Sequence, residues 1–411
     1  MDKKALFLFL LIIFSLKYFD GTFGREGIMK NIDYGYMLIA IIISIPYMFK
    51  KSGGFIFPIQ LICAAILISI LMAKYTWGQG FEYSTTTIPY MMWFVFFYLI
   101  NNHIPISKIE SIILIFGIIY IVLFLFQFSH NGTVYFGSQQ EFKEDRGVVR
   151  INFPGGGVFF LSCFIAINKF TNKELRYNFL WLSYAIIGLV ITVMQVTRQV
   201  IFVVLIFYMI HFLRNVKFIY KIGTIILFSC TFYIFINSGI SISTGLVNQQ
   251  KEDASAGKDY IRIQAAEYYL TKFNSNAVNK VLGNGFFNDT SNYGKSLILL
   301  GENYGYYLTD VGIVEVYIVF GIFAIVGYLI ILIKSIVIPV PPNYQYLKYY
   351  LWMIMLTSLT SDFLISYNFL IATVLVLCCY QKIYESEKAK QLISSNNQLN
   401  LNEIHNRYSS I

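Results

Sequence analysis

Long apolar runs, separated by short polar segments, dominate the pattern of the chain. Each run covers about 15 to 22 residues, which is the length a helix needs to cross a hydrocarbon core of about 30 Å. The pattern therefore predicts an all-α polytopic membrane protein with about twelve transmembrane helices. The predicted spans lie near residues 5–19, 33–49, 54–73, 86–101, 109–128, 154–168, 178–195, 199–213, 218–237, 311–333, 347–360 and 363–381.

The composition agrees with a membrane protein. Hydrophobic residues make up 57% of the chain and charged residues 13%, whereas charged residues in soluble domains reach about 25%. The first run follows Lys3 and Lys4, lacks a small-residue cleavage site and is followed by Lys17, so we expect it to be retained as the first span. The five cysteines lie in apolar runs, which indicates buried thiols.

The charges of the loops predict which side of the membrane each loop occupies. With the N-terminus in the cytoplasm, 17 of the 31 cations fall on the inner side, and six of the other 14 lie in segment 238–310. Long loops translocate regardless of charge, so the fair comparison is 17 against 8. We therefore expect both termini to lie in the cytoplasm. The excess positive charge behind the net charge of +9 is then explained by cations that anchor the cytoplasmic loops. Nucleic acid is therefore rejected as a partner.

The chain divides into a membrane domain over residues 1–382 and a polar tail over 383–411, which we expect to be cytoplasmic and disordered. Two extracytoplasmic loops interrupt the membrane domain, at about 129–153 and 238–310. The first leads into a proline and three glycines, which permit close backbone approach at a helix start. In the second, residues 259–273 form an amphipathic pattern, "VLGNGFFND" is a glycine-rich turn, and "SLILL" is expected to be re-entrant or interfacial.

Four arginines are predicted on the outer side, beside a membrane boundary or within the two loops: Arg146, Arg150, Arg198 and Arg262. A guanidinium keeps its charge and binds phosphate or carboxylate through two parallel hydrogen bonds. The arginines therefore fit a substrate with a phosphate headgroup in the outer leaflet.

Simpler interpretations of the same arginines stay open. Arg198, in "VMQVTRQVIFVV", lies at the tip of a helical hairpin or inside the bundle, and a hairpin arginine can reach the interface without binding a ligand. Arg146 can be a solvated loop charge, and Arg262 can pair with Glu267 or Asp259. The functional interpretation depends on whether "TRQ" lies beside the two loops in space.

Further chemistry is sparse in the sequence. The four histidines show no metal-ligand spacing, and phosphate-binding glycine loops and nucleophile elbows are absent. Carboxylates that could act as a general base near the outer surface are Asp289, Glu302 and Asp310. Tyr268 and Tyr269 are among several loop tyrosines that could stack on sugar rings, although tyrosines also form interfacial aromatic belts.

Three stretches resemble bacterial O-antigen and capsule repeat-unit polymerases of the Wzy type. The stretch "RGVVRINFPGGGVFFLSCFIA" is similar to the family segment in which an arginine and an Asn/Pro/Gly turn precede a span. "TRQVIFVVLIF" is similar to the family's short outer turn with a basic residue opening a helix. "RIQAAEYYLTKFNSNAVNKVLGNGFFN" resembles the large-loop pattern of arginine, aromatic helix and GxG turn, followed by the span "DVGIVEVYIVFGI".

The resemblance implies a fold similar to class C glycosyltransferases and a glycosyltransferase that needs neither metal nor cofactor. It would join undecaprenyl-diphosphate-linked oligosaccharides, with membrane lipid, a chain-length regulator and a flippase as further partners. Family arginines are implicated in binding the diphosphate, which carries over to Arg150, Arg198 and Arg262, and less directly to Arg146. We expect catalytic roles for Arg198, Arg262 and Asp310, and substrate binding by Arg146, Arg150, Tyr268 and Tyr269.

Two other functions remain open from the sequence. An O-antigen ligase uses the same donor, but ligases carry a histidine late in the large loop, and segment 238–310 has none. A transporter or flippase for lipid-linked oligosaccharide would distribute charges along a central cavity, often with two similar halves, and no convincing repeat is present.

Overall fold

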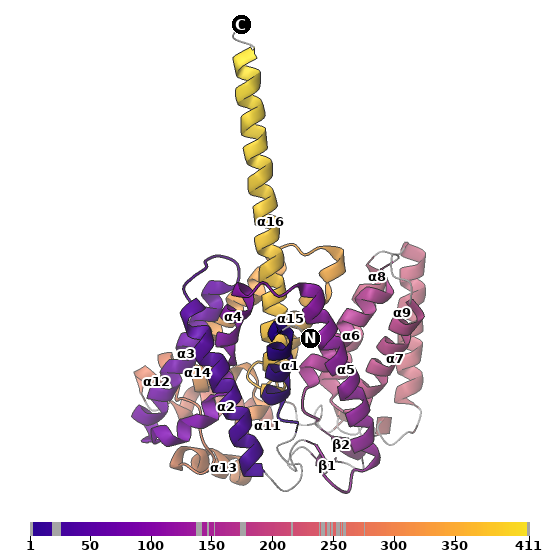
Figure 1. Ribbon diagram of the computed structural model, residues 1–411. Helices are drawn as coiled ribbons and strands as arrows, with labels where there is room; N and C mark the ends of the chain where they lie inside the picture. Colours follow the sequence, from indigo (N-terminus) through magenta and orange to yellow (C-terminus); the bar gives the residue numbers. More distant parts are fainter. Residues whose placement is uncertain are drawn as a thin grey trace.

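The computed structural model is a helical bundle with one short β-hairpin (Figure 1). It describes residues 3–18, 26–136, 142–145, 148–151, 153–172, 178–214, 217–237, 260–274 and 276–408, together with isolated positions 239, 243, 244, 247, 250, 251, 255 and 257. The bundle helices are α1 (Lys3–Leu16), α2 (Glu26–Ser44), α3 (Ile56–Trp77), α4 (Val95–Asn101), α5 (Ile106–Ser129), α6 (Gly156–Phe170), α7 (Asn178–Met194), α8 (Arg198–Leu213), α9 (Phe218–Ile236), α14 (Ile313–Val337), α15 (Tyr346–Thr357) and α16 (Tyr367–Tyr408).

The two predicted extracytoplasmic loops contain shorter elements. The first holds the antiparallel strands β1 (Phe142–Asp145) and β2 (Val148–Ile151). The second holds α11 (Ile261–Tyr268), a π-helical turn (Tyr269–Phe273), α12 (Ala277–Leu282) and α13 (Asn292–Tyr304). The expected amphipathic segment 259–273 is thus α11 with the π-turn, and "SLILL" lies within α13.

The helices have the length and composition of membrane spans. Among the described residues, five are long and apolar enough to cross a bilayer: Gly27–Tyr47, Ile56–Trp77, Ile106–Ser129, Ile313–Val337 and Tyr367–Gln391. Shorter apolar helices cover Tyr90–Asn101, Gly156–Phe170, Asn178–Met194 and Arg198–Leu213. Each of the predicted runs overlaps a helix. A helical membrane fold is therefore confirmed, whereas the number of twelve spans stays a prediction.

The loop elements and the C-terminal extension lie at opposite ends of the bundle. Strands β1 and β2 and helices α11 and α13 lie at one end, and α16 projects from the other (Figure 1). Cations that the charge count assigns to the inner side meet near α16, where Lys51 pairs with Glu385 at 2.8 Å and Lys334 donates to the carbonyl of Gly54. The charge pattern thus separates along the bundle axis, and which end faces the cytoplasm stays a prediction.

The last helix of the bundle, α16, extends into the polar tail and ends at Tyr408. The segment after residue 382 contains no glycine or proline that would end a helix. An ion pair between Lys390 and Glu387 at 2.7 Å, three residues apart, adds local support. The disorder and the cytoplasmic location expected for residues 383–411 stay predictions.

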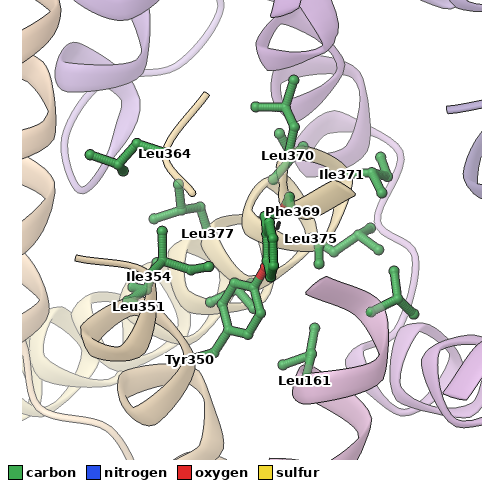
Figure 2. Packing of buried hydrophobic residues seen from close by; sticks show 14 of the residues in the cluster. Leu161, Tyr350, Leu351, Ile354, Leu364, Phe369, Leu370, Ile371, Leu375 and Leu377 are labelled. Atoms are coloured by element: carbon green, nitrogen blue, oxygen red, sulfur yellow. Dashed lines mark hydrogen bonds between the residues drawn. The ribbon is translucent and has the colours of Figure 1, made fainter. Parts of the chain in front are cut away.

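The core forms where α6, α15 and α16 meet (Figure 2). Leu161, Tyr350 and Phe369 come from these three helices, and the hydroxyl of Tyr350 donates to the carbonyl of Phe369 at 3.1 Å. A Cβ atom on Gly157 would lie 2.7 Å from Cα of Phe369. The glycines at the start of α6 therefore permit the close backbone approach that the sequence predicted.

The glycine-rich turn after α12 is interlocked with a break in α14. Gly321 has non-helical angles (φ 74°, ψ −170°), which interrupts the hydrogen bonding of α14. The backbone N–H groups of Asn284 and Gly285 donate to the carbonyls of Ile318 and Val319 at 2.7 and 3.0 Å. The loop thus satisfies carbonyls that a continuous helix would have used, as buried backbone in a membrane requires.

Candidate functional site

A polar segment between α15 and α16 brings together residues from distant parts of the chain. We call residues Ser358 to Ser366, with the sequence "SLTSDFLIS", the 358–366 connection. It follows the end of α15 at Thr357 and ends one residue before α16. The first turn of α8, α11 and the start of α14 all contact it, as the following distances show.

Gln199 fixes the first turn of α8 to the 358–366 connection. Its Nε2 donates to the carbonyls of Leu356 and Thr357 at 3.0 and 2.9 Å. Its Oε1 accepts from the hydroxyls of Thr360 and Ser361 at 2.9 and 3.2 Å. Both donors and both acceptor lone pairs of this amide side chain are thereby used.

Arg262 reaches the same connection from α11. Its Nη1 donates to the carbonyl of Thr360 at 3.3 Å, and its Nη2 pairs with Oδ1 of Asp310 at 3.4 Å. Among the described residues its acidic partner is therefore Asp310 rather than Glu267, and Asp259 lies outside the described residues. About a third of the Arg262 side chain is exposed, so the cation is oriented and still accessible to solvent.

Arg198 is the first residue of α8, directly after a tight turn from α7. Val196 in that turn has a positive φ of 55°. Nη1 of Arg198 donates to Oε1 of Gln250 in the long loop at 3.1 Å, and the side chain is partly exposed. The structure thus places Arg198 at the hairpin tip and not within the bundle, and the turn "TRQ" contacts the second of the two loops.

The start of α14 adds carboxyl groups to the site. A Cβ atom on Gly312, which has a φ of 58°, would lie 2.4 Å from the carbonyl oxygen of Ser358, so α14 begins against the connection. Glu315 in the first turn is 3% exposed, and its Oε2 has no hydrogen-bond partner among the described residues. It lies close enough to Asp310 and Asp362 to interact with them electrostatically. Buried acids without partners are costly and occur at functional positions.

Asp362 has the proton affinity that a general base needs near neutral pH. Burial raises its pKa to about 6, and the neighbouring carboxylate of Asp310 raises the pKa further, while a hydrogen bond from its own backbone lowers it. Its carbonyl accepts from the N–H groups of Ile365 and Ser366 at 2.9 and 2.8 Å, which fixes the turn into α16. The side chain is thus held at the centre of the connection.

The arginines of the first loop are placed less completely. Arg150 lies on β2 opposite Lys143 of β1, and its side chain lies outside the described part of the chain. Arg146 lies outside the described residues altogether. The segment after the hairpin does reach the site region, because Gly155 donates its N–H to Oδ1 of Asn368, two residues beyond the 358–366 connection, at 3.1 Å. The end of the first loop is therefore anchored beside the same connection.

The two predicted sugar-stacking tyrosines lie in different environments. Tyr268 is partly exposed and lines a pocket between α3, α11 and α13. Tyr269 is 0% exposed, and its hydroxyl donates to the carbonyl of Tyr306 at 2.8 Å. Tyr269 thus belongs to the core beneath the loop, whereas Tyr268 remains available for a ligand. The other candidate bases, Asp289 and Glu302, are exposed on the loop surface.

The site combines two guanidinium groups, Arg198 and Arg262, with three carboxyl groups, Asp310, Glu315 and Asp362. The guanidinium groups suit phosphate oxygens, and a carboxylate with a pKa of about 6 can accept a proton. Among the described residues, no group of three or more His, Cys, Asp and Glu side chains is arranged to hold a metal ion.

The sequence analysis missed Gln199, Thr360 and Asp362. A usable signal was present, because "TSD" at 360–362 is a polar triplet between two apolar runs. Short polar turns between spans are common, and nothing local in the sequence distinguishes a turn that contacts distant segments. The triplet could therefore not be selected from the sequence.

Comparison with known proteins gives no relative: no protein-family model matches the chain, and no curated protein matches it. The fold itself defines a multi-pass helical membrane protein. At one end of its bundle, Arg262 and the residue after Arg198 bond to a polar connection that contains Asp362, an acid with a raised pKa.

Proposed function

We propose that the protein polymerises undecaprenyl-diphosphate-linked oligosaccharide repeat units by glycosyl transfer at the outer leaflet of the bacterial cytoplasmic membrane. The observation that carries the proposal is the shared attachment to Thr360. Its carbonyl accepts from Arg262 and its hydroxyl donates to Gln199, the residue after Arg198. Arg262 and the residue after Arg198, far apart in the chain, are thereby held to one short segment that also contains an acid with a raised pKa.

The proposed reaction joins a hydroxyl of one repeat unit to the anomeric carbon of another. The new carbon–oxygen bond forms as the bond from the anomeric carbon to the diphosphate oxygen breaks, and the diphosphate leaves with the bonding electron pair. Arg198 and Arg262 neutralise this growing negative charge. The carboxylate of Asp362 accepts the hydroxyl proton, and Asp310 orients Arg262 through their ion pair.

Deletion of the gene followed by gel analysis of surface polysaccharide tests the proposal. A polymerase deletion leaves a single repeat unit on the acceptor and removes the ladder of longer chains. Loss of all attached polysaccharide would instead indicate a ligase. Accumulation of lipid-linked units facing the cytoplasm would indicate a flippase.

Arginine-to-lysine variants test the diphosphate interaction at equal expression. Lysine keeps the charge and loses the planar fork, so Arg198→Lys and Arg262→Lys should shorten the chains. Arg214→Lys is the matched control, because Arg214 is exposed and follows the opposite end of the same helix, α8. Full-length polysaccharide from both site variants would overturn the proposed role of the arginines.

A further inference from the structure

A pocket of about 330 Å³ lies between the end of α3, the α11 region and α13. Its walls include Trp77, the last residue of α3, Tyr268 and Lys272 from the segment after Arg262, and Ser296, Asn303 and Tyr304 from α13. Small-molecule pockets have volumes of about 300 to 1,000 Å³. The pocket is therefore of the size that accommodates one small polar ring.

Aromatic rings form one wall of this pocket. The rings of Tyr268 and Tyr304 both pack against Tyr306, with centroids 5.5 and 5.8 Å from it. Tyr304 is 62% exposed, so much of its ring remains uncovered. A pyranose ring has an apolar C–H face and a polar hydroxyl edge, and it matches a pocket with aromatic faces and polar groups such as Ser296 and Asn303.

Trp77, another residue of the pocket wall, carries a hydrogen-bond donor on its indole ring. One face of its indole stacks on Tyr293 with a centroid distance of 4.6 Å and an angle of 4° between the planes. Its Nε1 is buried and has no hydrogen-bond partner among the described residues. A buried N–H without an acceptor is unfavourable, and Trp77 is one of the residues that line the pocket.

Lys272 gives the pocket its charge. It is the one charged residue among the described residues that line the pocket, and its side chain is exposed. It lies on the π-helical turn Tyr269–Phe273, a type of turn that is frequent at functional sites. An ammonium group at the pocket wall favours a ligand with a negative substituent.

The pocket lies next to the arginine site along one helix. Tyr268 follows Arg262 by six residues on α11, which corresponds to about 9 Å along the helix axis. After α13, the chain passes from Tyr304 to Asp310, the partner of Arg262. Arg262 and the pocket are thus connected through the same short helix and the same chain segment before Asp310.

We propose that this pocket is a pyranoside-binding subsite that selects a sugar carrying a carboxylate, with Tyr304 contacting the ring and Lys272 binding the acid. The inference rests on the proposed function in one respect, because it identifies the ligand as a sugar of the lipid-linked oligosaccharide. The binding chemistry itself is independent of polymerisation.

The test uses the fluorescence of Trp77 in the full-length protein in lipid nanodiscs. Nanodiscs are necessary because alkyl maltoside detergents carry sugar headgroups that would compete. Methyl glucuronide is titrated as the acidic probe and methyl glucoside as the neutral one. We expect a saturable change in fluorescence that disappears in Trp77→Phe. The wild-type protein should bind the glucuronide at least tenfold more tightly than the glucoside.

Three variants make the result specific. Tyr304→Ala should weaken both glycosides at least tenfold, and Lys272→Gln should weaken the glucuronide alone. Lys280→Gln is the matched control, because Lys280 is exposed on α12 of the same loop and does not line the pocket. It should bind both probes as the wild type does.

Two results would overturn the inference: no saturable change with either glycoside, or binding that persists unchanged in Tyr304→Ala. Equal affinity for the two glycosides would overturn the role of Lys272. These outcomes are separate from those of the gene deletion. Loss of the ladder without glycoside binding rejects the subsite alone, and glycoside binding with an intact ladder rejects the polymerase alone.

Discussion

The hydroxyl of Thr360 donates a 2.9 Å hydrogen bond to Oε1 of Gln199, although 161 positions separate the two residues in the chain. Through this bond the first turn of α8 and the 358–366 connection hold each other in place. The carbonyl of the same Thr360 accepts from Arg262, so the position of this guanidinium depends on the connection as well.

Gln199→Leu should therefore affect both stability and chain length. The substitution removes two donated and two accepted hydrogen bonds, each of which contributes about 1 kcal/mol. We expect a loss of about 2 to 4 kcal/mol of unfolding free energy, measured by thermal unfolding in nanodiscs, and shorter polysaccharide. Gln195→Leu is the control, since Gln195 lies in the turn before α8 and its side chain makes one described hydrogen bond, to the hydroxyl of Tyr120. Equal effects of the two changes would contradict a special role for Gln199.

Asp362→Asn should remove a pH dependence from the reaction. The proposed base must be ionised, and its pKa of about 6 predicts a wild-type rate that rises with pH and levels off above about pH 6. General bases contribute about 10²- to 10⁴-fold, so the variant should be at least about a hundredfold slower. Its remaining rate should be independent of pH in this range. A variant that retains the wild-type pH profile would exclude Asp362 as the base.

Asp362→Asn should lower the reaction rate but raise the stability of the fold. An acid whose pKa is raised from 3.8 to about 6 on folding binds more protons in the folded protein, so its ionisation destabilises the fold. This cost is absent below about pH 4, grows up to about pH 6 and then stays constant, at up to about 3 kcal/mol. Asp362→Asn should thus unfold at a higher temperature than wild type at about pH 8 and at a similar temperature at about pH 4. A stability difference that does not vary with pH would contradict the raised pKa.

Asp310→Asn distinguishes the role of Asp310, which orients Arg262, from that of Asp362, the proposed base. The Arg262–Asp310 pair has side chains that are 34% and 46% exposed, and such ion pairs contribute about 0 to 1 kcal/mol. We expect little change in stability and a kcat within about tenfold of wild type, against at least about a hundredfold for Asp362→Asn. Steady-state kinetics with lipid-linked substrate measures kcat for both variants. A loss of kcat in Asp310→Asn as large as that in Asp362→Asn would indicate that Asp310 is the base.

Gly283→Ala should destabilise the interlock between the long loop and α14. Gly283 has a φ of 78°, and a Cβ atom there would lie 2.6 Å from the backbone nitrogen of Gly321. Backbone strain contributes about 1 to 3 kcal/mol, and the clash adds to it. Gly78→Ala is a matched control, since Gly78 also has a positive φ, of 64°, but would meet nothing within 4 Å. Thermal unfolding should show a clearly larger loss for Gly283→Ala, and equal losses would show that the contact with Gly321 is unimportant.

The helices could be predicted from the sequence because hydrophobic periodicity is a local property. Each apolar run overlaps a helix, and the glycines at the start of α6 do permit the expected close approach. The break at Gly321 could not be predicted in the same way. It depends on hydrogen bonds from Asn284 and Gly285, which precede the helix and are not signalled within it.

The candidate site could be predicted only in part. Arginines at loop boundaries were visible as rare charges in an apolar chain, and Arg262 and the residue after Arg198 do bond to one connection. Their neighbours were not visible, because Gln199 and Thr360 gain importance only from contacts across more than 150 positions. A raised pKa at Asp362 likewise comes from burial that sequence position does not reveal.

The interlock at Gly321 has a consequence for the synthesis and engineering of the protein. Asn284 and Gly285 emerge from the ribosome before the helix whose carbonyls they satisfy. These N–H groups can therefore form their hydrogen bonds only after α14 has been synthesised and has packed against the turn. The long loop and α14 thus form one structural unit. Grafting the loop into another protein, to transfer sugar specificity for example, would require grafting α14 with it.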